Sequence, residues 1–307
     1  MISWQAMLLN GFFRFTMKRH GKQPINLERL RAMTRNPPRS ALAIPTGYRV
    51  DSVRSEEGLQ FDVADVSSAR TAPASTIVLY LHGGGYLFGS PQTHRQVLLA
   101  MAKAFQAPVY GLDYRLAPEH PFPAAVEDAA RAYEWLLTRH PDAAIVLSGD
   151  SAGAGLAIAT AVGVRDRGSR LPLGLVAFSP YSDLAVTGAS VESNAKSCAM
   201  FTPRGVREAA TMYLAGAQPQ DPRASPLYAD LSGLPPMLLF VSRHEILRDD
   251  TLRLADRATA AGVKVELVMR DRLPHVWPVF VRLLPEARDA FATVATFAKA
   301  LGAGNGA

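Results

Sequence analysis

The hydrophobic positions of the chain fall into two alternating kinds of segment. Short, almost wholly apolar runs are typical of strands buried on both faces of a sheet, and longer segments with helical spacing are typical of amphipathic helices. Such strands are predicted at residues 76–81, 107–112, 143–147, 173–178 and 236–241. Helices are predicted at residues 126–137, 152–164, 203–214, 252–261 and 285–301. The alternation predicts an α/β protein with a mostly parallel sheet.

The two edges of the sheet are predicted from alternating patterns. Residues 47–53 and 59–66 are expected to form a hairpin, and residues 263–268 alternate as an edge strand exposed on one face does. The connection between strands 173–178 and 236–241 is far longer than such a connection usually needs. We therefore expect an inserted segment there.

Residues 1–20 place large apolar side chains at helical spacing. These side chains are Trp4, Met7, Leu8, Phe12 and Phe15. The stripe predicts an amphipathic helix that packs on the rest of the protein. A membrane-surface helix is the alternative interpretation, because aromatic and basic residues together also suit a lipid interface.

Composition narrows the functional classes. The 307 residues are 48% hydrophobic, which excludes global disorder and allows one large α/β domain or two small ones. The net charge of +6 comes from scattered basic residues, so we expect no nucleic-acid partner. Cys198 is the only cysteine, which favours a reducing, cytoplasmic location. We find no leader pattern and no segment apolar enough to cross a bilayer, so no stable membrane insertion is expected.

A Gly-x-Ser-x-Gly motif, Gly149-Asp150-Ser151-Ala152-Gly153, lies between strand 143–147 and helix 152–164. This context predicts a sharp turn that exposes the Ser151 hydroxyl at a helix N-terminus, where negative charge is favoured. The alternative is a glycine-rich turn with a bystander serine. The strand before the motif and the helix after it favour a nucleophile.

Three glycines, Gly83, Gly84 and Gly85, follow strand 76–81 directly. Because they lack a Cβ, their amide groups can converge on one point. A loop placed one strand and one helix before the Ser151 turn is where an oxyanion hole is built. The Ala152 amide would be the other donor. His82 precedes these glycines and suits a loop-fixing role better than that of a base.

Four motifs in order resemble a known family. They are His82-Gly-Gly-Gly-Tyr86, Asp113-Tyr-Arg-Leu-Ala-Pro-Glu119, Gly149-Asp-Ser-Ala-Gly153 and Pro274-His275-Val-Trp277. Together they resemble the hormone-sensitive-lipase-like carboxylesterases of the α/β-hydrolase fold. The resemblance implies a mostly parallel eight-stranded sheet flanked by helices, with a helical cap. It also implies hydrolysis of short- to medium-chain carboxylic esters without a metal or cofactor.

The resemblance also divides the chain. It assigns residues 1–45 and 182–220 to the cap, and residues 46–181 and 221–307 to the two parts of the hydrolase core. A substrate pocket would be lined by side chains from these motifs and the cap, although helix packing accounts for such apolar residues about as often. The candidates are Tyr86, Asp150, Met200, Phe201, Met212, Tyr213, Val276 and Trp277, with Phe12 and Phe15 from the first helix.

The expected chemistry is that of a serine hydrolase. Ser151 would attack the ester carbonyl, His275 would take its proton, and a carboxylate would orient His275. Aligning Leu247-Arg248-Asp249 with the family's usual Leu-Arg-Asp puts Glu245 where the catalytic aspartate stands. Asp249 is the alternative acid, although Asp249 and Asp250 also suit the start of the next helix.

Other functions remain open from the sequence. A hydrolase-shaped binding protein is one, because plant gibberellin receptors resemble this family yet lack a working triad. His275 favours an enzyme, since such a receptor loses its base. An amidase or a lactonase could use the same residues, and the expected partner is a small ester molecule, with a homodimer left open.

Overall fold

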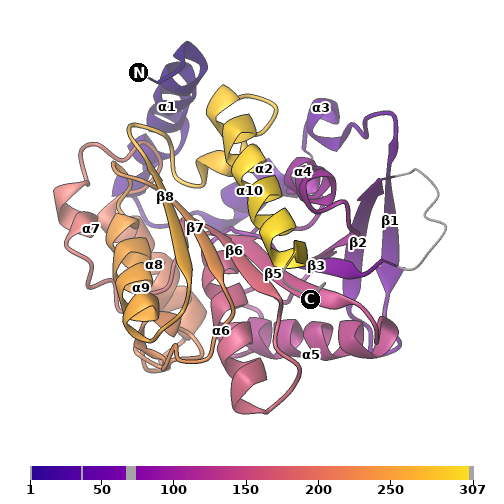
Figure 1. Cartoon of the computed structure of the whole chain (residues 1–307). Helices are drawn as coiled ribbons and strands as arrows, with labels where there is room; N and C mark the ends of the chain where they lie inside the picture. The colour runs from indigo at the N-terminus through magenta and orange to yellow at the C-terminus, as the bar shows by residue number, and fades with distance from the viewer. Residues whose placement is uncertain (1, 36, 67–73, 304–307) are drawn as a thin grey trace.

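The structure, a computed structural model, describes residues 2–35, 37–66 and 74–303. Its centre is an eight-stranded sheet in the order β1-β2-β4-β3-β5-β6-β7-β8, in which β3 to β8 run parallel to one another and β2 runs antiparallel to both of its neighbours, β1 and β4 (Figure 1). The strands are β1 (Tyr48–Arg54), β2 (Gln60–Val66), β3 (Thr76–Leu81), β4 (Val109–Leu112), β5 (Ala144–Asp150), β6 (Gly174–Phe178), β7 (Met237–Ser242) and β8 (Val265–Arg270). The sequence-based prediction of a mostly parallel sheet with a hairpin at one edge is confirmed.

Helices cover both faces of the sheet. Side chains alternate along β3, so that Leu79 joins the core under α5, α6 and α9, and Tyr80 joins the core under α4 and α10 (Figure 1). These helices are α4 (Arg95–Phe105), α5 (Ala124–Arg139), α6 (Ala152–Asp166), α9 (Arg248–Ala260) and α10 (Pro285–Ala303). Because helices cover the sheet on both faces, its central strands are apolar at nearly every position.

The chain reverses its winding direction at β3. The strand that follows it, β4, pairs on one side, and β5 pairs on the other, with Leu81 opposite Gly149. Open parallel sheets place ligands at the carboxyl ends of strands beside such a switch. The loop after Leu81 and the turn after Asp150 therefore emerge side by side.

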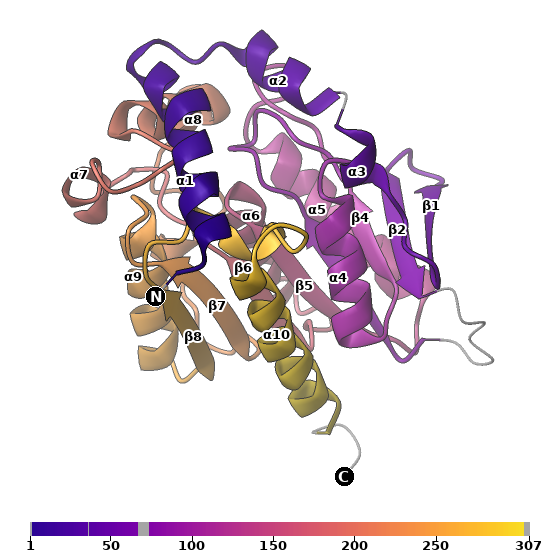
Figure 2. The same cartoon turned by 90° about the horizontal axis from the view of Figure 1, so that it is seen from above.

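A separate layer lies above these carboxyl ends (Figure 2). It contains α1 (Trp4–Thr16), η1 (Lys18–Lys22), α2 (Leu27–Arg35), α3 (Arg39–Leu42), α7 (Ser190–Ser193) and α8 (Pro203–Leu214). The two parts of this layer are joined by hydrogen bonds, from Thr202 Oγ1 to the Gly21 carbonyl (2.9 Å) and from Lys18 Nζ to the Cys198 carbonyl (2.6 Å). Short η2 (Pro226–Tyr228) and η3 (Trp277–Val279) complete the described elements.

The packing of α1 differs from the expectation. The predicted apolar stripe is turned to solvent, with exposed fractions from 56% for Phe12 to 66% for Phe15. The opposite face packs instead, through Ala6, Leu9 and Phe13. The helix is apolar on both faces, so its periodicity could not decide which face packs.

The start of α6 lies against the end of β3 with no room for a side chain. A Cβ on Gly153 would collide with the carbonyl oxygens of Leu81 and His82, and a Cβ on Gly149 would collide with the backbone of Gly153. Both glycines of the Ser151 motif are therefore required by close backbone approach.

Replacing Gly153 by alanine should lower the free energy of unfolding by about 2 kcal/mol or more, because the added methyl group must separate two backbone segments. Gly163→Ala in the same helix is the matched control. Its Cβ would meet only the guanidinium end of Arg167, at 3.2 Å, and alanine favours a helix. Thermal unfolding measures both, and an unchanged midpoint for Gly153→Ala would contradict this packing account.

Candidate active site

Ser151 has a strained backbone between β5 and α6. Its φ of 53° and ψ of −121° lie where residues other than glycine are rarely found. Two backbone hydrogen bonds hold it there: the Ser151 amide donates to the Phe178 carbonyl (2.8 Å), and the Tyr181 amide donates to the Ser151 carbonyl (2.9 Å). The side chain lines a pocket of the described structure although Ser151 is only 8% exposed.

The loop after β8 brings His275 to Ser151. The Ser151 hydroxyl donates to His275 Nε2 at 2.9 Å. The Phe201 ring and the imidazole meet edge to face, with ring centroids 5.0 Å apart. The imidazole is 1% exposed, so only the pocket side of Nε2 is open to an incoming group.

Glu245, from the loop after β7, lies on the far side of the imidazole. His275 Nδ1 donates to Glu245 Oε1 at 2.8 Å. The second oxygen, Oε2, accepts from the Ser179 hydroxyl and from the Ser242 amide, both at 2.9 Å. These donors satisfy a carboxylate that is almost fully buried and fix its orientation.

The competing carboxylates point elsewhere. Asp249 Oδ2 accepts from the Ser190 amide at 2.8 Å, in the first turn of α9. Asp250 Oδ2 accepts from the amides of Ser182 and Asp183. Burial, and then the charge of Asp183, raises the pKa of Asp250 well above its usual value. Neither side chain contacts His275.

The glycine loop supplies donors, but not all of those expected. The Gly83 amide donates to Asp150 Oδ1 at 2.9 Å and is therefore unavailable to a substrate. Gly84 and Gly85, with φ of 125° and 63°, line the pocket. With the amide of Ala152 at the first residue of α6, they remain the candidate oxyanion donors.

Asp150 anchors this loop from below. Its Oδ1 also accepts from the Tyr80 hydroxyl (2.8 Å) and lies 3.4 Å from His94 Nε2. Burial is the largest single influence and by itself would lower the pKa of His94, but the Asp150 charge together with the hydrogen bonds to Asp150 and to the Ser90 carbonyl raises it. The pKa of Asp150 is lowered in turn, because His94 and the hydrogen bonds outweigh its own burial. The two groups form a buried ion pair beneath the glycines.

His82 supports the loop as a neutral group. Burial, together with neighbouring His94, lowers the pKa of His82 to about 3. Its Nδ1 donates to the Gly83 carbonyl at 2.8 Å, and its ring stacks on Tyr114 with centroids 4.2 Å apart. His244 immediately precedes Glu245 in the loop after β7. It accepts a hydrogen bond from the Arg272 amide and does not line the pocket.

The pocket above Ser151 has a volume of about 960 Å³. Of the expected lining residues, Asp150, Met200, Phe201 and Val276 contribute to it. From α1, Phe13 lines it in place of the expected Phe12 and Phe15.

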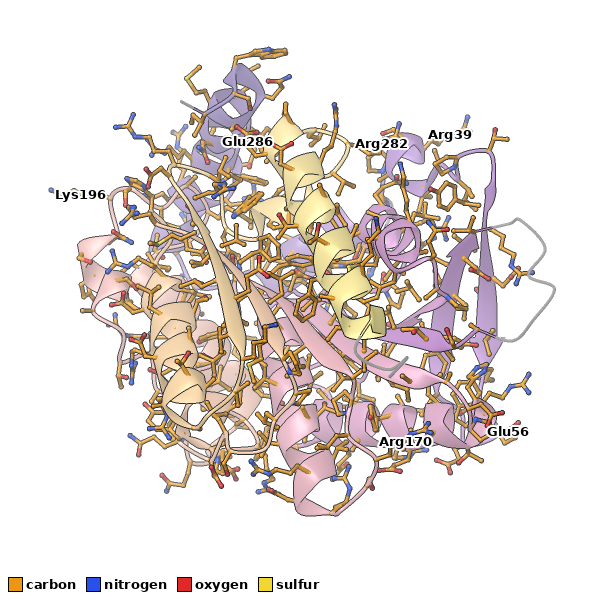
Figure 3. All side chains as sticks on the ribbon, viewed as in Figure 1. Arg39, Glu56, Arg170, Lys196, Arg282 and Glu286 are labelled. Atoms are coloured by element: carbon orange, nitrogen blue, oxygen red, sulfur yellow. The ribbon has the colours of Figure 1, made fainter. Side chains whose placement is uncertain are left out.

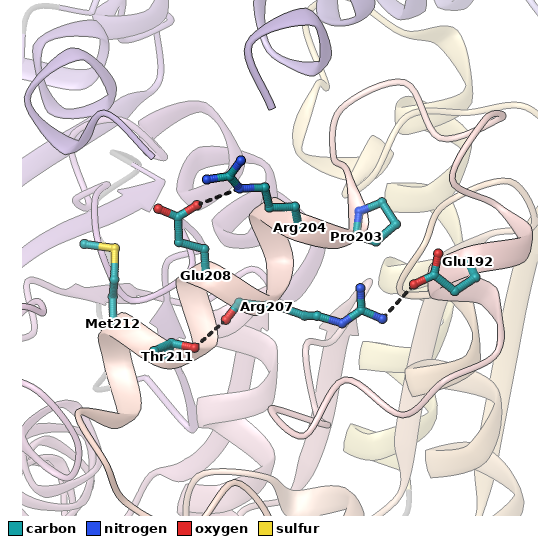
Figure 4. Close-up of a pocket in the computed structure, with 7 residues that line it drawn as sticks. All are labelled: Glu192, Pro203, Arg204, Arg207, Glu208, Thr211 and Met212. Carbon is teal, nitrogen blue, oxygen red and sulfur yellow. Dashed lines mark hydrogen bonds and ion pairs between the residues drawn. The ribbon is translucent and has the colours of Figure 1, made fainter. Parts of the chain in front are cut away.

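The other expected lining residues lie outside this pocket. Tyr86 and Tyr213 are buried and stack on each other, with centroids 3.8 Å apart. Trp277 packs against Phe240 in the core. Met212 lines a separate hollow of about 690 Å³ on the outside of α8, beside the ion pair of Arg207 and Glu192 (Figure 4).

Sequence reasoning missed two groups of residues at this site. Ser179 has no motif of its own, and only its position after β6 brings it to Glu245. The α2 helix, which contributes Leu30 to the pocket, was also missed. The sequence does contain a signal for the start of α2, because asparagine is a common helix-capping residue. In the structure, Asn26 Oδ1 accepts from the Arg29 amide in this way.

Within residues 2–35, 37–66 and 74–303, no group of three or more His, Cys, Asp or Glu side chains could hold a metal ion. None of the helices in these ranges is both long and apolar enough to span a bilayer.

The Asp150–His94 pair should give stability that depends on pH. The pair is fully ionised between the ordinary pKa values of the two groups, 3.8 and 6.5. Wild type should therefore exceed His94→Gln in thermal stability most strongly in this window. The difference should shrink as pH rises through the raised pKa of His94.

His140→Gln is a control of opposite sign. Burial lowers the pKa of His140, so the wild-type advantage over this variant should shrink on acidification. Thermal unfolding across the pH range tests both variants. A pH-independent difference for His94→Gln would contradict the ion pair.

Comparisons with known proteins identify the family of the chain. Residues 78–279 match a family model described as alpha/beta hydrolase fold. An acetyl-hydrolase of Streptomyces hygroscopicus is 44% identical over 72% of this chain and 74% of its own, and an esterase of Acinetobacter venetianus is 38% identical over 75% and 77%.

Solved structures extend the likeness to nearly the whole chain. A crystal structure of EstE5 soaked with ethyl alcohol has a TM-score of 0.89 and 36% identity, covering 98% of this chain and 99% of that one. An esterase from the bacterial hormone-sensitive lipase family has a TM-score of 0.87 and 39% identity, covering 97% and 98%. The chain therefore belongs to the hormone-sensitive-lipase-like carboxylesterases of the α/β-hydrolase fold.

Proposed function

We propose that this carboxylesterase cleaves short- to medium-chain esters with a triad of Ser151, His275 and Glu245. The observation that supports the proposal is the unbroken line of hydrogen bonds from the Ser151 hydroxyl through both nitrogens of His275 to Glu245. Such a line lets one imidazole remove a proton on one side while a carboxylate stabilises the resulting charge on the other.

The reaction begins at Oγ of Ser151. Oγ attacks the ester carbonyl carbon while His275 Nε2 takes the hydroxyl proton, and the carbonyl oxygen becomes an oxyanion. Amide groups of Gly84, Gly85 and Ala152 would stabilise that charge, aided by the dipole of α6. His275 then gives its proton to the leaving alcohol, and an acyl group remains on Ser151.

Water completes the cycle. The oxygen of a water molecule attacks the acyl carbonyl while His275 takes a proton from that water. His275 then gives the proton to Oγ of Ser151 as the carboxylic acid leaves. Glu245 stays ionised throughout and stabilises the imidazolium. The binding energy of the acyl chain supplies orientation but none of the proton transfers.

We assign the acyl chain to the apolar side of the pocket. Residues 1–45 and 182–220 would act as one cap, because their helices form a layer over Ser151 and contribute Phe13, Met17 and Phe201 to the lining. An apolar wall favours hydrocarbon over charged substrate groups. The acetyl-hydrolase and esterase names of the relatives favour an ester over an amide or a lactone.

Glu245→Gln should lower kcat for p-nitrophenyl butyrate by about 10³- to 10⁴-fold, because His275 loses the charge that stabilises its protonated form. Asp249→Asn, four residues further along in the first turn of α9, is the matched control. Its carboxylate accepts from the Ser190 amide and does not reach the imidazole, so kcat should stay near wild type. An active Glu245→Gln beside an inactive Asp249→Asn would overturn the assignment of the acid.

Phe13→Ala should shift the acyl-length preference toward longer chains, because it removes a ring from the pocket wall. Phe12→Ala is the matched control, since the neighbouring ring is 56% exposed and lies outside the lining. The kcat/KM values for p-nitrophenyl esters from acetate to decanoate measure the shift. Identical profiles for wild type and Phe13→Ala would argue against a cap that limits the acyl chain.

A further inference from the structure

The outer face of α1, defined by Trp4, Met7, Leu8, Phe12 and Phe15, is the largest group of exposed apolar side chains that the structure describes on one element. Each of these residues is more than half exposed. A helix on a protein surface normally turns polar residues outward. An apolar outer face of this kind is typical of a surface that binds a partner.

Basic residues border this face. Arg14 and Lys18 donate to carbonyl groups of the loop 196–198, which fixes their positions. Arg19 is exposed and lies over the Phe15 ring, 5.6 Å from its centroid. Lys196, in the same loop as the acceptor carbonyls, is exposed at the edge of the molecule (Figure 3).

Acidic residues are absent from the first 27 positions of the sequence, which include Arg14, Lys18, Arg19 and Lys22. At the other end of α1, the Glu286 carboxylate accepts from the amide and hydroxyl of Ser3. The large apolar side chains of the outer face are therefore bordered by positive charge at the C-terminal end of α1.

This charge distribution discriminates between occupants. A second copy of the chain, packed face to face, would bring two basic borders together without acidic partners in these segments. A bilayer with anionic headgroups offers hydrocarbon to the rings and negative charge to the basic border. We propose that the outer face of α1 docks on the surface of an anionic lipid bilayer.

The length of α1 suits a helix lying in the bilayer surface. Its 13 residues span only about 20 Å, less than the hydrocarbon core of a bilayer. Phe13, on the inner face of the same helix, and Met17, at its C-terminal cap, both line the pocket. A docked bilayer would therefore lie about one helix diameter, roughly 10 Å, from the ester-binding pocket.

The test is flotation of the full chain with two kinds of large unilamellar vesicle. One is pure phosphatidylcholine, and in the other about a quarter of the lipid is phosphatidylglycerol. Wild type should float with the anionic vesicles, and raised salt should weaken its binding. The variant Leu8→Ser/Phe12→Ser/Phe15→Ser should bind about tenfold less or weaker still.

Two controls separate docking from folding. Leu171→Ser/Leu267→Ser removes exposed apolar side chains, 39% and 37% exposed, from the loop before β6 and from β8, and should bind like wild type. The triple α1 variant should keep wild-type turnover of soluble p-nitrophenyl acetate, because none of its three positions lines the pocket.

Arg19→Gln/Lys196→Gln tests the contribution of the basic border and should bind anionic vesicles several-fold less well.

Three results would overturn the proposal. They are failure of wild type to bind the anionic vesicles, equal binding by the folded triple variant, and equal binding of wild type to the neutral vesicles. Light scattering adds a further test. A wild-type dimer that the triple variant converts to a monomer would identify the face as a subunit interface and would also overturn the proposal.

Discussion

The backbone of α6 meets the end of β3 at Gly153, and the geometry of the whole site depends on this contact. Because Leu81 pairs with Gly149, the two strands end at the same level, and the glycine loop begins beside the turn that holds Ser151. A side chain at Gly153 would force these two segments apart. The contact therefore sets the distance between the Ser151 hydroxyl and the amides of Gly84 and Gly85.

Two buried carboxylates stabilise this arrangement from opposite sides. Asp150 binds the Gly83 amide and forms an ion pair with His94, so it fixes the glycine loop. Glu245 binds His275 and is itself held by Ser179 and Ser242. Removing one partner of such a group leaves polar atoms buried without compensation, which costs more than the hydrogen bond itself is worth. Both carboxylates thus stabilise the fold and orient the site.

The sequence predicted the fold closely where a local pattern determines the structure. The bounds of β3 and α8 match the prediction, because a strand buried on both faces is uniformly apolar and Thr202 with Pro203 marks a helix start. Contacts between distant segments were not predictable in this way. Because α1 is apolar all round, its pattern could not show that Phe13 rather than Phe12 faces the pocket. The Gly83 amide donates to the side chain of Asp150, which lies 67 positions away in the sequence.

We propose Ser151 as the nucleophile, activated by His275 and Glu245. The most direct test of this proposal is to treat the protein with diethyl p-nitrophenyl phosphate and to locate the adduct by peptide mass spectrometry. Esterase activity should be lost in proportion to the attachment of a single diethyl phosphoryl group to Ser151. Inactivation with the label on another residue, such as Ser148 or Ser179, or full labelling of Ser151 without loss of activity, would contradict it.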